Sequence, residues 1–282
     1  MLRSVIKSFF FSLILAVILM GSQTSLTLAA LEPNRTAPVQ SQQQNPVPLP
    51  NLNQPPAAVP NPQIVPAPKA EVQPPPQEPQ TAQINPVDDA DINALYTGQV
   101  NSNGKAEGRG LAKGRDSYVG DFKNGKKSGY GVYIDQRSGL RYEGQFADDL
   151  ANGQGMSLFP SGWLYEGGFK DGQFSGQGTL RLRNIFNYTG TFLNNNFDGA
   201  GIFEQYGVIK IIGHFKSGKL NGFCTVTVPD GSGYQADFVN GQPHGQALFF
   251  NYQGQENYTT VFDNGKETGP RQTIANSSRR NT

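Results

Sequence analysis

Tyr-Glu-Gly-Gln-Phe at residues 142–146 returns 23 residues later as Tyr-Glu-Gly-Gly-Phe at residues 165–169. The same kind of opening recurs along the second part of the chain, at spacings of 22, 24, 23, 23, 23, 23 and 24 residues, with starts at Tyr96, Tyr118, Tyr142, Tyr165, Tyr188, Ile211, Tyr234 and Tyr258. Self-similarity at a fixed period of this length is typical of repeat architectures. We therefore predict eight repeat units.

Each unit reads as a β-hairpin. The pattern Tyr-x-Gly-x-Phe alternates with period two, which places Tyr, Gly and Phe on one face of a strand. Turn dipeptides such as Asn124-Gly125 and Asp171-Gly172 follow, and they supply the positive φ that tight hairpin turns require. The structural positions in the four clearest units are Tyr118, Gly120, Phe122, Tyr142, Gly144, Phe146, Tyr165, Gly167, Phe169, Tyr188, Gly190 and Phe192.

A second strand of each hairpin is expected to begin near a recurring Gly-x-Gly pair, as at Gly129/Gly131, and to end at turns such as Pro160-Ser161-Gly162. Later units replace the second glycine of the pair with Cys224 or Ala247. Because glycine has no side chain, neighbouring Tyr and Phe rings can lie across the bare backbone. The predicted fold class is all-β, an elongated single-layer array of about eight antiparallel β-hairpin repeats.

These units resemble the membrane occupation and recognition nexus (MORN) repeat. The openings at Tyr142 and Tyr165 are similar to the start of that repeat, and Asn124-Gly125 with Gly129-Tyr130-Gly131 to its middle. The resemblance covers residues 96–270, with departures at Asp149, Asn195, Ile211 and Pro270. It implies a scaffold that binds another protein or itself as a homodimer, and MORN repeats are also associated with lipid contact.

The residues before and after the repeats differ from them in composition. Residues 1–30 combine Arg3 and Lys7 with an apolar run and a small, polar stretch, which predicts a secretory signal peptide, with a signal anchor as the alternative. Residues 31–95 hold sixteen prolines between Pro33 and Pro86 together with many glutamines, so we expect a disordered spacer. A Pro-rich ligand for aromatic-lined grooves is the alternative reading. Residues 271–282 are predicted to be a disordered tail.

Charge and composition exclude several classes of protein. The chain has 23 basic and 22 acidic residues, which argues against general nucleic-acid binding. A single cysteine and two histidines give neither a disulfide scaffold nor zinc-ligand spacing. The near-match to a phosphate-binding loop at residues 120–127 is the repeat itself and joins no strand to a helix. We expect no catalytic residues, no metal and no cofactor.

Candidate binding residues remain. Trp163 shares the face of Tyr165 and is predicted to be a core residue, with a ring exposed in a groove as the alternative. Lys123, Lys126 and Lys127 form a basic cluster that could contact an anionic partner. The favoured function is an exported, periplasmic or extracellular, non-catalytic interaction scaffold. The alternatives are a module that binds membrane lipid, whose attraction to anionic membranes is limited by the zero net charge of the array, and one that binds cell-wall glycan.

Overall fold

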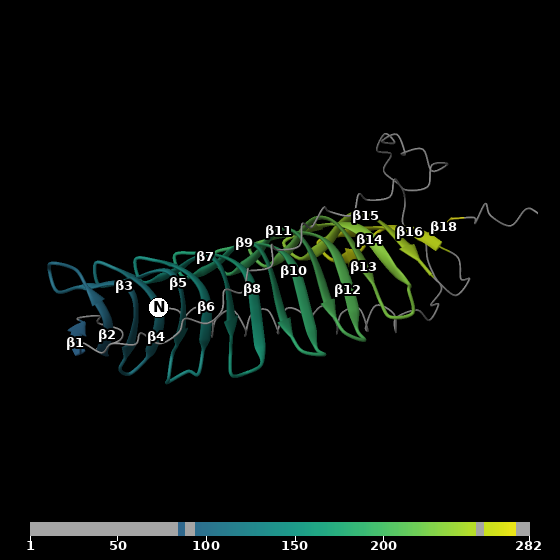
Figure 1. The fold of residues 1–282 in the computed structure, drawn as a ribbon. Coiled ribbons are helices and arrows are strands. Elements are labelled where there is room, and N and C mark those ends of the chain that lie inside the picture. The colour runs from purple at the N-terminus through teal and green to yellow at the C-terminus, as the bar shows by residue number, and fades with distance from the viewer. Residues whose placement is uncertain (1–83, 88–93, 252–256, 275–282) are drawn as a thin grey trace, which may run out of the picture.

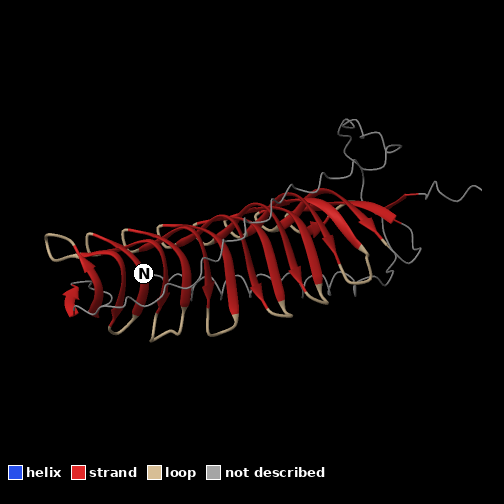
Figure 2. Cartoon of the chain, viewed as in Figure 1, coloured by secondary structure: helices blue, strands red, loops and turns tan. Residues whose placement is uncertain are grey.

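The computed structural model describes residues 84–87, 94–251 and 257–274. The predicted signal segment and most of the predicted linker lie outside these residues. Within them every element is a β-strand, and the strands lie side by side along one axis (Figures 1 and 2). The prediction of an all-β array is confirmed.

Eight hairpins form the array, in the order in which they occur along the chain. They are β2 (Ala94–Val100) with β3 (Ala106–Lys113), β4 (Ser117–Lys123) with β5 (Lys126–Ile134), β6 (Arg141–Ala147) with β7 (Leu150–Leu158), β8 (Trp163–Lys170) with β9 (Gln173–Leu182), β10 (Phe186–Leu193) with β11 (Asn196–Gln205), β12 (Ile209–Lys216) with β13 (Lys219–Thr227), β14 (Gly233–Val239) with β15 (Gln242–Phe250), and β16 (Asn257–Asp263) with β17 (Lys266–Glu267). Each strand from β2 to β16 pairs antiparallel with the next, so one continuous sheet results.

The second strand of each hairpin begins directly after the turn, and not near the Gly-x-Gly pair as expected. β5, for example, starts at Lys126 and contains Gly129 and Gly131 in its interior. The first glycine of each pair has a φ between 59° and 103°, at Gly108, Gly129, Gly153, Gly176, Gly199, Gly222 and Gly245. The strand register shifts at the same place in the first seven hairpins, as between Gly120 and Asp121 opposite Gly129. The first glycine therefore forms a bulge that bends the strand. Figure 1 shows the strands of the array as curved ribbons.

The second glycine of each pair leaves room for a tyrosine ring. Gly131 lies directly opposite Gly120, and the Tyr118 ring covers both. A methyl group on Gly131 would lie 2.4 Å from Cε2 of Tyr118, which is far inside van der Waals contact. Tyr118 is fully buried although the described residues form only one sheet and no second layer over it. The prediction that the rings lie across bare backbone is confirmed.

The rings also join one repeat to the next. Phe122 packs edge-to-face against Tyr96 and Tyr118 with both centroid distances at 5.0 Å, and Phe146 does the same between Tyr118 and Tyr142. This alternation continues to Phe215, which lies 5.3 Å from Tyr188. Edge-to-face geometry of this kind adds about 0.5–1.5 kcal/mol per pair beyond burial. The inner face is thus a continuous aromatic zipper.

Short strands cover both ends of the sheet. β1 (Ile84–Val87) pairs with β2 at one end, and β18 (Gln272–Ile274) pairs with β16 at the other. Pro86 lies within β1 and Pro270 precedes β18, and proline removes a donor that another strand would need. The folded part therefore extends past the predicted boundaries, because β1 falls in the expected linker and β18 in the expected tail.

Candidate functional site

The inner face of the first five units is closed to ligands. The hydroxyl of each repeat tyrosine donates a hydrogen bond to the backbone carbonyl three residues later, as from Tyr142 to Gln145 at 2.8 Å and from Tyr165 to Gly168 at 2.8 Å. Tyr96, Tyr118 and Tyr188 make the equivalent bond. Burial raises the pKa of these hydroxyls, so they stay protonated donors. The structural positions named from the sequence build the fold and present no binding group.

Trp163 belongs to this core. Its side chain is buried, and its ring centroid lies 5.1 Å from that of Phe186 in the next unit. The first of the two expectations for Trp163, a core position, matches this placement. The alternative of an indole exposed in a groove is corrected, because the inner face closes over the ring.

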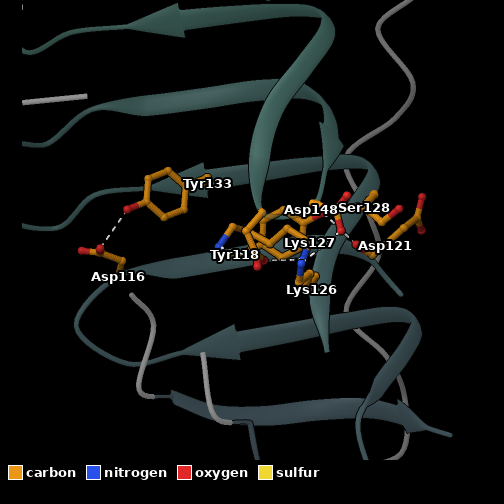
Figure 3. A network of polar contacts seen from close by, with 9 residues as sticks. Asp116, Tyr118, Asp121, Lys126, Lys127, Ser128, Tyr133 and Asp148 are labelled. Atoms are coloured by element: carbon orange, nitrogen blue, oxygen red, sulfur yellow. Dashed lines mark hydrogen bonds and ion pairs between the residues drawn. The ribbon is translucent and has the colours of Figure 1, made fainter. Parts of the chain in front are cut away.

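The three lysines do not form one basic surface. Figure 3 shows two of them, Lys126 beside Asp148 and Lys127 over the Tyr118 ring. Lys123 and Lys126 are exposed beside the hairpin turn, but Lys127 is only 4% exposed. The Nζ atom of Lys127 lies 3.5 Å from Oδ1 of Asp149 and 5.8 Å from the ring centroid of Tyr133. Lys127 follows the turn and points inward, where its stem packs on the aromatic zipper. The expected cluster is corrected to two exposed lysines, of which Lys126 pairs with Asp148 at 3.2 Å.

Asp149 and Asn195, the two departures at the turn glycine, have a structural role. Both residues have positive φ, at 70° and 65°, as glycine has in the other turns. The Asp149 carboxylate accepts the backbone N–H of Lys127 at 2.7 Å, and the Asn195 side chain accepts that of Phe174 at 2.8 Å. Each therefore bonds to the second strand of the preceding hairpin. Asn and Asp tolerate this conformation and add a hydrogen bond that glycine cannot make.

The outer face of the sheet carries a continuous row of cross-strand neighbours. This outer row contains one residue from each strand from β2 to β16 and comprises Thr97, Leu111, Val119, Val132, Glu143, Met156, Glu166, Thr179, Thr189, Ile202, Ile212, Thr225, Gln235, Leu248 and Thr259. Nearly all its members are half-buried. Only Glu143 and Glu166 are charged, and Glu143 accepts from Tyr130 and pairs with Arg141.

A second exposed region lies at the turns that connect one hairpin to the next. Ile185 is 54% exposed in one such turn, and Tyr206 and Val208 are 48% and 42% exposed in the following one. The backbone N–H of Tyr206 donates to the carbonyl of Ile185, so the two turns touch. Arg183 is exposed in the same place. We call Ile185, Tyr206 and Val208 the return-turn edge.

The described residues offer few groups for metal binding or for reaction as a nucleophile or base. Within them, no group of three or more His, Cys, Asp or Glu side chains could hold a metal ion. Cys224 is fully buried, and burial raises the pKa of its thiol to about 11. His244 lies 3.6 Å from Asp263 on the surface. No helix in the described part of the chain is long and apolar enough to cross a membrane.

The last units differ from the first five on the inner face. Ala236 lies opposite Ala247 where earlier units have two glycines, so Tyr234 cannot cover the backbone there. Its ring instead stacks on Phe249 at 5.1 Å, and Phe249 stacks on Tyr258 at 4.7 Å with a ring angle of 2°. We call these three half-buried rings the C-terminal ladder. The ladder was not predicted from the sequence, although the change from glycine to Ala247 is its signal.

The two tyrosine hydroxyls of the ladder are hydrogen-bond donors without an acceptor among the described residues. Within the described residues, the hydroxyls of Tyr234 and Tyr258 donate no hydrogen bond, in contrast to the five repeat tyrosines before them. The guanidinium of Arg271 lies 5.2 Å from the ring centroid of Tyr258 and makes two hydrogen bonds of 2.8 Å with Glu267. The ladder therefore combines three half-buried stacked rings with two phenolic hydroxyls and one cation.

Comparison with known proteins identifies the repeats. A sequence model described as the MORN repeat matches six times, at residues 118–137, 142–164, 165–184, 188–205, 212–233 and 234–250. No curated protein matches the chain. Among solved structures, the TCP domain of SAS-4 (dCPAP) from Drosophila melanogaster, in complex with a proline-rich motif of Ana2 (dSTIL), aligns over 64% of this chain and 90% of that chain. Its identity is 7% and its TM-score 0.33, which is too low to establish a shared fold. The six matched repeats establish that the chain is a MORN repeat protein.

Proposed function

We propose that the protein is a non-catalytic, exported scaffold that binds another protein or a second copy of itself. The observation that carries this proposal is the outer row, an elongated and nearly uncharged strip that no other described element covers. Contiguous surface with few charges and several apolar side chains is typical of protein interaction sites. Because β1 and β18 occupy the two ends of the sheet, we expect a partner to bind the face and not to add a strand.

The experiment is capture from the native cells after mild cross-linking, with identification of the captured proteins by mass. The variant Ile202→Lys with Ile212→Lys places two charges on the outer row and leaves the inner face intact. The control Leu150→Lys places a charge on an exposed side chain beside a hairpin turn. A partner, or a second copy, that is lost with the outer-row variant and kept with the control supports the proposal. Equal capture by all three chains contradicts it.

A second candidate function is binding to membrane lipid. The return-turn edge favours it, because three exposed apolar side chains lie beside the basic residues Arg183 and Lys210. Apolar groups flanked by cations suit the boundary of an anionic membrane. Sedimentation with phosphatidylserine vesicles tests this function: the native chain should bind in a salt-sensitive manner, and Ile185→Asp with Val208→Asp should abolish binding. No binding at low salt would exclude it.

Export is part of the proposal and rests on residues 1–30. The expected result is a mature chain that begins near Ala30 and is found outside the cytoplasm. Mass analysis of the N-terminus of the native protein tests this expectation. An intact N-terminus in the membrane fraction would instead support the signal anchor.

A further inference from the structure

The C-terminal ladder has the features of a site for a polyproline II segment. Such segments dock on aromatic side chains, and their backbone carbonyls are free to accept hydrogen bonds. The ladder offers three aromatic rings and, within the described residues, two tyrosine hydroxyls that donate no bond. Its rings stack face to face, with ring angles of 20° and 2°. A flat sugar needs an open ring face, so this arrangement favours a ligand that lies across ring edges.

The spacing of the ladder matches the repeat of the ligand. Tyr234 and Tyr258 lie on strands β14 and β16, which flank β15. Two strand spacings amount to about 9.6 Å. One turn of a polyproline II helix contains three residues and rises about 9.3 Å. Successive turns of the ligand would therefore present equivalent carbonyls to the two hydroxyls.

The chain itself contains a segment with this repeat. Seven of the sixteen prolines between Pro33 and Pro86 are separated from each other by multiples of six residues, namely Pro38, Pro50, Pro56, Pro62, Pro68, Pro74 and Pro86. Residues three or six apart share one face of a three-residue helix. Between residues 47 and 62 that face consists of Val47, Pro50, Asn53, Pro56, Val59 and Pro62. Such a segment would place an almost entirely apolar side on the ladder.

The segment is long enough to reach the site. The first described strand, β1, begins at Ile84 at the opposite end of the array from the ladder. From β1 to the strands of the ladder the distance is about 62–72 Å at the usual strand spacing. A polyproline II chain covers this distance with roughly 20–23 residues. Residue 62 and those before it are therefore within reach.

We propose that residues 47–62 bind the C-terminal ladder of the same chain as a polyproline II segment, so that the linker folds back along the array. The tether favours this occupant, because a linked ligand reaches a high effective concentration without any additional contact. The proposal is independent of the scaffold function: the linker would cover the inner side of the last units, whereas the outer row stays open.

The test measures a distance within the full chain. Gln54→Cys lies off the apolar side of the segment, and Thr273→Cys is exposed directly opposite Tyr258. Spin labels on the two cysteines report their separation, and the buried Cys224 does not compete for the label. A linker that leaves β1 as a free coil would give a broad distribution around roughly 60 Å or more. A bound linker should give a narrow population at less than half of that distance.

Two pairs of variants identify the residues that make the contact between the linker and the C-terminal ladder. Tyr234→Phe with Tyr258→Phe removes the two hydroxyls and keeps the rings, and it should lower the docking equilibrium at least about tenfold because two hydrogen bonds are lost. The control Tyr206→Phe removes a hydroxyl from an exposed tyrosine elsewhere. Serine at Pro50, Pro56 and Pro62 should release the linker, whereas serine at Pro48, Pro55 and Pro60 should have a smaller effect. Thermal unfolding of each variant checks that the array is intact.

Three outcomes would overturn the proposal. A broad, long distribution in the native chain would show that the linker is not bound. A short distance that resists both the tyrosine and the proline variants would place the linker elsewhere. Dilution of labelled chains with an excess of unlabelled chains must leave the short distance unchanged; its disappearance would mean that the linker binds a second copy.

Discussion

The first five units and the last three have the same strand order but different inner faces. In the first five, a glycine pair is covered by a tyrosine whose hydroxyl is bonded to the backbone, as with Tyr165 over Gly167 and Gly178. In the sixth unit Ile211 replaces the tyrosine, and the sulfur of Cys224 fills the space over Gly213. In the seventh unit Ala236 and Ala247 turn Tyr234 into a stacked ring. The hairpin topology therefore depends on the turns and bulges, and the inner packing can change from unit to unit.

The largest expected effect comes from filling a glycine pair of the first region. Gly131→Val would place its side chain inside the Tyr118 ring, since even a methyl group there lies 2.4 Å from it. We expect a loss of about 3 kcal/mol or more in unfolding free energy, because overpacking displaces a ring that neighbouring repeats share. Denaturant unfolding followed by circular dichroism measures the loss.

The matching change in the last three units is Ala247→Gly, at a position that the Tyr234 ring does not cover. There we expect a loss of only about 1 kcal/mol, from a lost methyl contact and a more flexible backbone. Equal losses for Gly131→Val and Ala247→Gly would show that the two regions do not differ as described.

The next effect concerns the pair of Lys127 and Asp149. Asp149→Ala leaves the buried ammonium of Lys127 without this carboxylate and removes the acceptor for its backbone N–H. We expect a loss of about 3 kcal/mol, as is usual when one partner of a buried ion pair is removed. Denaturant unfolding measures the loss.

The fourth unit supplies a matched rescue. Phe174 of the fourth unit occupies the place of Lys127, Asn195 of the fifth unit occupies that of Asp149, and the Phe174 ring stacks on Tyr165 at 3.7 Å. The double variant Lys127→Phe with Asp149→Asn copies this arrangement and should recover most of the stability lost in Asp149→Ala. A double variant no more stable than Asp149→Ala would mean that the Lys127–Asp149 and Phe174–Asn195 positions are not equivalent.

The sequence predicted the repeat, the hairpins and the rings over glycine because these features follow from period two and from turn chemistry. It did not predict the bulge at Gly129, since a register shift leaves no mark in an alternating pattern. The sequence placed Lys127 among the possible binding residues, because no local signal shows that its stem points inward. The C-terminal ladder depends on the contact of Ala236 with Ala247 across two strands, which only the register reveals.

A smaller effect is expected where the two regions meet. Ile211→Tyr introduces the ring of the earlier units, but Cys224 occupies the space that the ring would need. We expect the single variant to lose about 2 kcal/mol through overpacking. Ile211→Tyr with Cys224→Gly recreates the earlier arrangement and should regain this loss, as a double-mutant cycle would show. Strict additivity of the two changes would contradict the equivalence of the units.

The smallest expected effect is an alkaline loss of stability at Cys224. Burial raises the pKa of its thiol from 9.0 to about 11, so the folded state favours the protonated form. The stabilising contribution is complete below the unfolded pKa and decreases as the pH rises from about 9 toward 11. Cys224→Ala should remove this part of the pH dependence, while the buried repeat tyrosines, whose pKa is also raised, should keep theirs at higher pH. Unfolding midpoints between pH 8 and 11 for both chains measure the difference, and identical curves would show that the thiol does not contribute.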